Sequence, residues 1–177
     1  MKVYSILLTA FFAVSLAAGE PLWNGEATGV RIVSKLAEQK FAVRDGAVTA
    51  TAVSNHPKYS YLTFNVEVKP FSFAKQGLTF EISVDQPLPG DSFYVKGLAA
   101  DGKCAISFYT FKIPAAGTRL TLLPGKLPDG FNVLGNDLKA APDAAVVKLQ
   151  FFLGRKTPEK PMSITISKIE TVENIKP

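Results

Sequence analysis

The sequence has one cysteine and one histidine among its 177 residues. A single cysteine cannot form an intramolecular disulfide, so packing alone must hold the fold together. Cys104 lies in phase with Ile106 and Phe108 and is predicted to be a small buried side chain. His56, in a turn sequence beside a proline, is expected to be an exposed loop residue rather than a catalytic base. We expect no metal and no cofactor, because this inventory does not supply a convincing set of ligands.

Helix signals, phosphate-binding loops and long basic runs are also lacking. The best helix candidate, Ser34–Gln39, is one short turn at most, and no glycine-rich loop opens a helix. The formal net charge of +5 is scattered, and its densest patch is Arg155-Lys156 with Lys160 at an expected hairpin tip. Scattered charge favours a solvated surface over a site for anionic polysaccharide, membrane surface or nucleic acid.

The first residues have the layout of a secretory signal peptide. Met1-Lys2 gives a positive start, Val3–Ala18 is almost wholly apolar, and Ala17-Ala18-Gly19 supplies small residues for cleavage after Gly19. This run is shorter than the ~20 apolar residues of a membrane span, and no second run is long enough to span. We therefore expect a secreted or periplasmic protein of bacterial type, with no membrane span and no nucleic-acid partner.

The remaining chain has the size of one domain. We expect a signal peptide over residues 1–19, a β-sandwich domain over 20–172 and a C-terminal tail over 173–177, with fraying from Glu170 onward.

Strand signals dominate that domain. Val, Ile, Thr, Phe and Tyr recur at every second position between Gly, Pro and Asp, and Asp45-Gly46 is a strong hairpin turn. In Tyr61–Val68, for example, the even-numbered positions are apolar and the odd-numbered ones are mostly polar. The segment Lys126–Pro142 is expected to be irregular. The expected strands are 29–33, 41–43, 47–53, 61–68, 78–84, 92–98, 103–113, 119–123, 146–153 and 162–169.

Strands with one apolar and one polar face need a partner layer. Frequent turns and the lack of crossover helices then favour an all-β, antiparallel sandwich of two sheets packed face to face, or a barrel.

The order of segments in the second half of the chain resembles a known family. "GLTFEISVD" is followed by "SFYVKGLAADGKCAISFYTFKI", "GTRLTLLPG", "AVVKLQFFLG" and "PMSITISKIETV". This order is similar to the galactose-binding-domain-like jelly roll of carbohydrate-binding modules, over roughly Gly77 to Val172. The resemblance implies an antiparallel two-sheet jelly roll. Many relatives hold a structural calcium with an acid in the closing Ile-x-x-Ile unit, but Ser167 and Lys168 stand there in this chain, so we expect no metal.

A jelly roll of this kind implies one sheet made of strands 61–68, 92–98, 103–111 and 146–153. A pyranose ring stacks its apolar C–H face on an aromatic ring, and its hydroxyls need donors and acceptors. The outward side chains of those strands offer both, so together they resemble a glycan-binding platform. For any single one of these residues, an ordinary solvated face or one covered by a neighbouring domain is the simpler interpretation. The outward side chains are Asn65, Glu67, Tyr94, Lys96, Ser107, Tyr109, Lys148, Gln150 and Phe152.

Loop aromatics form a second candidate set. Trp23 follows the expected signal, and Tyr59 and Tyr61 flank a loop at one end of the sandwich. Trp23 could equally plug the end of the core, since tryptophans are usually largely buried.

Three functional hypotheses follow. The first is a non-catalytic glycan-binding module with a glycan as its ligand. The second is a structural or protein-interaction domain of the bacterial envelope without a small-molecule ligand. The third is a glycan-active enzyme that uses Glu67 or Glu81 in a carboxylate pair, and it is disfavoured because solvated strand glutamates are common. We therefore expect that the protein is not an enzyme.

Overall fold

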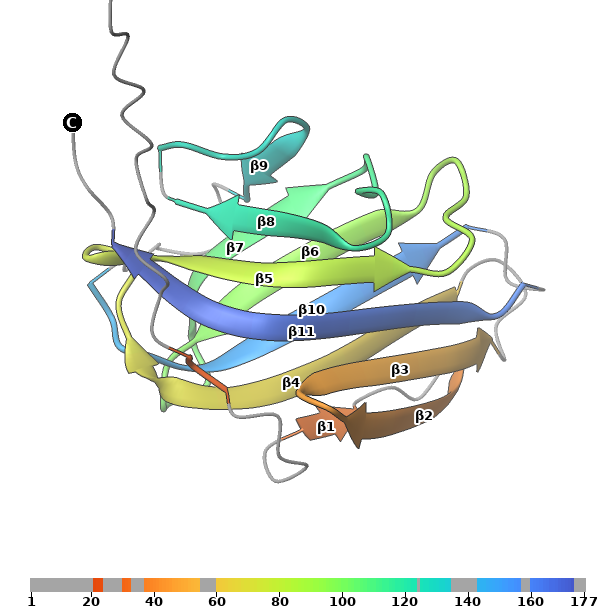
Figure 1. Ribbon diagram of the computed structural model, residues 1–177, viewed down its shortest axis with the longest axis horizontal. Helices are drawn as coiled ribbons and strands as arrows, with labels where there is room; N and C mark the ends of the chain where they lie inside the picture. The colour runs from red at the N-terminus through yellow and green to blue at the C-terminus, as the bar shows by residue number, and fades with distance from the viewer. Residues whose placement is uncertain are drawn as a thin grey trace, which may run out of the picture.

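The computed structural model describes residues 21–23, 30–32, 37–54, 60–123, 125–134, 143–156 and 160–173. Within these ranges the chain consists of strands and turns, and the strands form two stacked antiparallel sheets (Figure 1). No helix in them is long and apolar enough to cross a bilayer. The strands are β1 Val30–Ile32, β2 Ala37–Arg44, β3 Ala47–Ser54, β4 Ser60–Phe71, β5 Gln76–Val84, β6 Ser92–Leu98, β7 Cys104–Thr110, β8 Thr118–Leu122, β9 Phe131–Val133, β10 Val146–Arg155 and β11 Met162–Glu173.

The first sheet has the order β1-β4-β10-β6-β7-β9, and the second has the order β2-β3-β11-β5-β8. The predicted two-sheet antiparallel sandwich is therefore confirmed. The four strands expected to share a sheet are β4, β10, β6 and β7, which lie side by side in the first sheet. The hairpin turn at Asp45-Gly46 joins β2 to β3 as expected.

Alternation along each strand separates the core from the surface. On β10, Leu149, Phe151 and Leu153 are fully buried, whereas Gln150 and Phe152 between them are half-buried on the outer side. Strands β4 and β5 follow the same rule, and their apolar side chains fill the space between the sheets.

Phenylalanine rings join the two layers. The Phe151 ring stacks on Phe64 of the neighbouring strand β4, with 5.3 Å between centroids. Phe80 of the opposite sheet meets Phe151 edge-on at 5.5 Å. Such edge-to-face and offset pairs stabilise a core beyond the area they bury, so β10 is anchored from beside and from across the sandwich.

Three expectations about local structure were wrong. Residues Ala37–Gln39 begin β2, so they are not part of a helical turn. The supposedly irregular segment after Lys126 contains β9, which pairs with β7 and buries Phe131. In the expected strand 146–153, Val147 is in phase with Leu149 and Phe151 and was therefore expected inside the core, but a bulge places Val146 there instead.

The last strand also runs further than expected. A register shift between Ser167 and Glu170, with Lys168 at φ 49°, lets β11 resume its pairing with β5 as far as Glu173. Thr171 is buried in this continuation. The expected fraying from Glu170 is therefore wrong, because the bulge restores the inward and outward alternation after its interruption at Lys168.

A buried ion pair closes one end of the sandwich. Asp91 and Arg155 have side chains that are each 1% exposed, with 2.9 Å between Arg155 Nη2 and Asp91 Oδ2. Arg155 also donates to the carbonyls of Gln86 and Pro161, and the Leu88 N–H donates to Asp91. The pair therefore ties the end of β10 to the loops before β6 and β11. Arg155 was expected at an exposed hairpin tip, and its burial corrects that expectation.

Removing one partner of this pair should destabilise the fold strongly. We expect Asp91→Ala to lower the free energy of unfolding by about 3–5 kcal/mol, because it leaves a buried guanidinium without its anion. Glu67→Ala breaks a 3.6 Å contact with Lys148 at a side chain that is 64% exposed, and should cost about 1 kcal/mol or less. Urea denaturation of both variants measures the difference. Equal losses of unfolding free energy in the two variants would contradict a stronger contribution from the buried Asp91–Arg155 pair.

Candidate functional site

Five aromatic side chains form a continuous row across the outer face of the first sheet. The register places Phe152 of β10 opposite Tyr94 of β6, and Tyr94 opposite Tyr109 of β7. Ring centroids are 5.3 Å apart for Phe152 and Tyr94 and 5.8 Å apart for Tyr94 and Tyr109. Tyr61 stacks on Phe152 at 5.8 Å, and Phe111 meets Tyr109 at 5.7 Å. Cross-strand contacts of this kind orient each ring and stabilise the sheet. We call these five residues the aromatic row.

A polar row lies beside the aromatic row. Gln150 is opposite Asn65 on one side and Lys96 on the other. The Gln150 side-chain amide donates to Asn65 Oδ1 at 3.0 Å, which fixes both amides on the sheet. One step further along the strands, Lys148 pairs with Glu67. The face therefore offers rings and hydrogen-bonding groups in adjacent rows.

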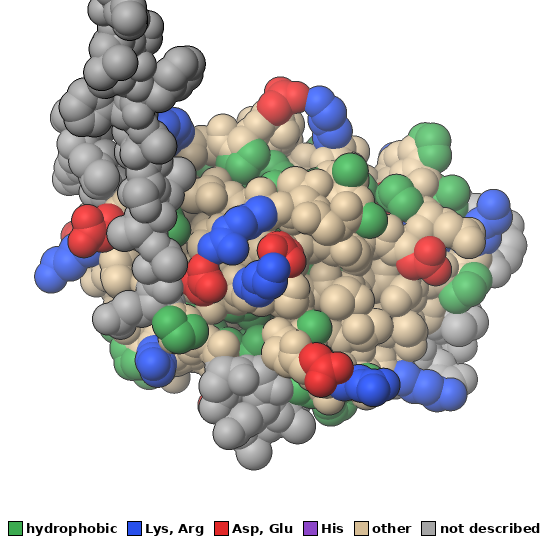
Figure 2. Space-filling model, in the orientation of Figure 1, with side chains coloured by type: hydrophobic (Ala, Val, Ile, Leu, Met, Phe, Trp, Pro, Cys, Tyr) green, Lys and Arg blue, Asp and Glu red, His purple; other side chains and the backbone are tan. Residues whose placement is uncertain are grey.

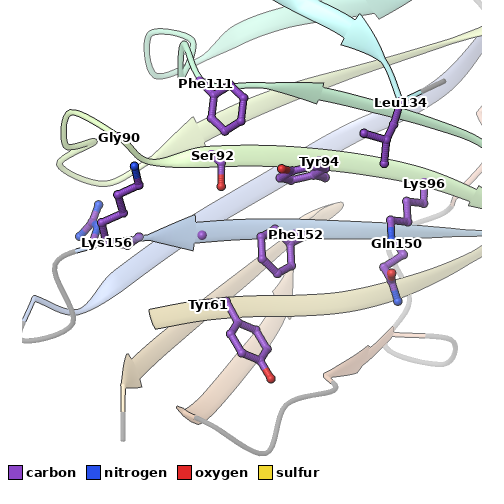
Figure 3. A pocket seen from close by; sticks show the side chains of 12 residues that line it. Tyr61, Gly90, Ser92, Tyr94, Lys96, Phe111, Leu134, Gln150, Phe152 and Lys156 are labelled. Carbon is purple, nitrogen blue, oxygen red and sulfur yellow. The ribbon is translucent and has the colours of Figure 1, made fainter. Parts of the chain in front are cut away.

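A groove of about 490 Å³ opens over part of this face. Its volume lies in the range of small-ligand sites. Phe152 and Tyr94 lie in its middle, Phe111 and Tyr61 lie on either side, and Lys156 and Lys96 lie at opposite ends (Figure 3). The lining residues are Tyr61, Gly90, Ser92, Tyr94, Lys96, Phe111, Leu134, Gln150, Phe152, Gly154, Arg155 and Lys156.

Small residues keep the groove open between its aromatic walls. Gly154 pairs with Ser92 across β10 and β6. A Cβ atom added at Gly154 would lie 2.8 Å from Ser92 Oγ and 2.9 Å from a Phe152 ring carbon. A larger residue would therefore force the hydroxyl and the ring to shift, so glycine preserves this part of the surface.

The predicted platform residues lie together, but they do not all line the groove. Tyr94, Lys96, Gln150 and Phe152 do, while Tyr109 stacks on Tyr94 just outside it. Outside the lining, too, are Asn65, which is bonded to Gln150, and the ion pair of Glu67 and Lys148.

Ser107 was expected to face solvent, and this was wrong. It lies opposite Lys96 but is 1% exposed, and its hydroxyl has no hydrogen-bond partner in the described part of the chain. The Leu134 N–H donates to the Ser107 carbonyl, so the chain after β9 runs alongside this position.

The loop aromatics divide in the structure. Trp23 is 8% exposed and belongs to the hydrophobic core, so its ring is not available on the surface and it plugs the sandwich instead. Neighbouring Leu22 bonds through its backbone to Ile169 and Lys69, which holds this segment against both sheets. Tyr61 lines the groove. Tyr59 and His56 lie outside the described residues.

The carboxylates proposed for an enzyme do not form a pair. Glu67 is on the outer face of the first sheet, where it contacts Lys148. Glu81 is on the outer face of the second sheet, 2.7 Å from Lys168. Two carboxylates on opposite sides of a sandwich cannot flank one glycosidic bond. Nor do three His, Cys, Asp or Glu side chains come together as a metal-ligand group anywhere in the described ranges.

Cys104 lies at the edge of the sheet rather than in the core. A register shift at Leu98 leaves it half-buried, although Ile106 and Phe108 are buried as predicted. Its thiol donates to the Ile106 carbonyl at 3.2 Å. Burial raises the pKa of the Cys104 thiol, and nearby Lys96 opposes this only in part.

The raised pKa predicts that the Cys104 thiol reacts slowly with alkylating reagents near neutral pH. Because only the thiolate reacts, the rate of Cys104 alkylation by iodoacetamide should rise with pH. We expect the inflection of this rise to lie at a higher pH in the folded protein than in urea-unfolded protein. Rates measured from pH 7 to 10 on folded and unfolded protein test this. An inflection in the folded protein at or below the unfolded one would contradict the burial argument.

Comparison with known proteins supports the fold and not a family. No protein-family model matches the sequence, and no curated protein sequence matches it. A solved structure from a study of promiscuous carbohydrate-binding modules of the β-sandwich superfamily has a TM-score of 0.54 at 15% identity, with 89% of this chain and 64% of that chain covered.

Two further structures are similar. A family 11 carbohydrate-binding module from Clostridium thermocellum, in complex with a β-1,3-1,4-mixed-linked tetrasaccharide, has a TM-score of 0.52 at 10% identity, with 88% of this chain and 96% of that chain covered. An exo-β-agarase has a TM-score of 0.52 at 11% identity, and this chain spans 25% of it. At such identities the likeness shows the fold, which is the jelly-roll sandwich of carbohydrate-binding modules.

Proposed function

We propose that this chain is an exported, non-catalytic module that binds a glycan on the outer face of its first sheet. The observation that carries the proposal is the aromatic row beside the polar row, with the groove above them. Phe152 and Tyr94 offer ring surface for the C–H faces of sugar rings. Gln150, Lys96 and Ser92 bring donors and acceptors to the same groove for sugar hydroxyls.

The similarity of this chain in size and fold to a known binding module supports the proposal. The family 11 module complexed with a mixed-linked tetrasaccharide is covered almost completely by this chain, so a sandwich of this extent is sufficient for a binding module. The separation of Glu67 and Glu81 onto opposite faces argues against hydrolysis by that pair. The signal-like residues 1–19 support export to where polysaccharides are met.

A glycan array followed by calorimetric titration tests the proposal. The mixed-linked tetrasaccharide and agar oligosaccharides are the first probes. We expect Tyr94→Ala and Phe152→Ala to weaken binding roughly two- to ten-fold each, since a ring contact is worth ~0.5–1.5 kcal/mol beyond the area it buries.

Phe41→Ala is the matched control. Phe41 is an aromatic residue on β2 of the second sheet and is 46% exposed, so its loss should leave glycan affinity unchanged. Equal weakening of glycan binding by Phe41→Ala and Phe152→Ala would contradict a binding site on the first sheet. Absence of binding to every glycan would favour the envelope structural or protein-interaction domain.

A further inference from the structure

The groove has a charge of one sign. Three of its lining side chains, Lys96, Lys156 and Arg155, are cationic, and none of the described lining residues is an Asp or Glu. The third lining cation, Arg155, is neutralised inside the protein by Asp91. Neither Lys96 nor Lys156 forms an ion pair with any acid in the described ranges.

The two lysines lie at opposite ends of the groove, with the rings of Tyr94 and Phe152 between them (Figure 3). Lys96 is opposite Gln150 on the neighbouring strand, and Lys156 follows Gln150 by six positions. At ~3.3 Å per residue, Lys96 and Lys156 are therefore roughly 20 Å apart along the strand direction. A Cβ atom at Gly90 would lie 3.4 Å from Lys156 Cδ, so the lysine stem lies over this glycine while the residue remains exposed.

Several cations elsewhere on the two sheet faces have acidic partners. On the first sheet Lys148 is paired with Glu67, beyond the groove. On the second sheet Lys168 pairs with Glu81 and Arg119 pairs with Glu170. The space-filling view of that second face shows basic and acidic side chains in contact at its centre (Figure 2). The groove differs from these places in that both of its lysines lack an acidic partner in the described ranges and no described acid lines it.

We propose that the groove is specific for an acidic glycan, that is, an oligosaccharide bearing carboxylate or sulfate groups at more than one position. This deepens the proposed function and rests on it. The sugar rings would lie along the strands over Phe152 and Tyr94, and the anionic substituents would meet Lys96 and Lys156 at the two ends. A charged group held by a lysine makes a charge-assisted hydrogen bond, which is stronger than one between neutral partners.

Matched pairs of polymers test the charge requirement. Polygalacturonate against its carboxyl-reduced product tests carboxylate, and κ-carrageenan against its desulfated product tests sulfate. Affinity electrophoresis and calorimetry should show tighter binding to the acidic member of at least one pair. That preference should shrink as NaCl is raised, because salt screens exposed charges.

Charge-removing variants locate the effect. Lys96→Gln and Lys156→Gln should each weaken binding of the acidic polymer roughly two- to five-fold, and the double variant roughly ten-fold. Binding of the neutral polymer should be weakened less, because glutamine has no charge but still offers a hydrogen-bond donor. Lys75→Gln is the control, because Lys75 is exposed in the turn between β4 and β5, outside the groove, and its loss changes the net charge equally.

The outcomes separate the inference from the function on which it rests. Equal or tighter binding of the neutral members would overturn the acidic-glycan inference and leave the glycan-binding proposal in place. Weakening by Lys75→Gln as large as that by Lys96→Gln would also overturn it, because the effect would then be one of net charge. Failure to bind any member of either pair, or any glycan of the array, would overturn both.

Discussion

Neighbouring side chains on a β-strand point to opposite faces of the sheet, and on β10 this constraint joins the core to the candidate site. Phe151 is fully buried between Phe64 of its own sheet and Phe80 of the other. Phe152, the next residue, therefore has to point outward, where it contacts Tyr61 and Tyr94. The packing that stabilises the sandwich thus also fixes the position of the central ring of the groove.

Much of the fold follows from that period of two. The alternating runs around Phe64, Phe80 and Phe151 identified three long strands and the inward face of each, and the outward face predicted most of the platform. Patterning of this kind is readable because each strand has one side in the core and one in water. Which strands are neighbours does not follow from the pattern, and the family resemblance supplied it.

The predictions failed where the backbone departs from regular pairing. Bulges change the inward position near Val146, leave Cys104 half-buried and carry β11 past Lys168, and a single-sequence pattern does not reveal them. Ser107 was placed by its local sequence, but tertiary contacts bury it, and of the two alternatives left open for Trp23 the structure shows the buried one. Several groove residues, including Phe111, Leu134, Gly154 and Lys156, were missed because the groove is formed by parts of the chain that only the fold brings together.

The account as a whole depends on ligand contact at the outer face of β4, β10, β6 and β7. Amide chemical-shift mapping by NMR, during titration with whichever glycan binds best, tests this most directly. The account predicts that the largest shifts fall on residues around Phe152, Tyr94 and Gln150, while the strands β2, β3, β11, β5 and β8 are unaffected on their outer face. Largest shifts on that second sheet would contradict it.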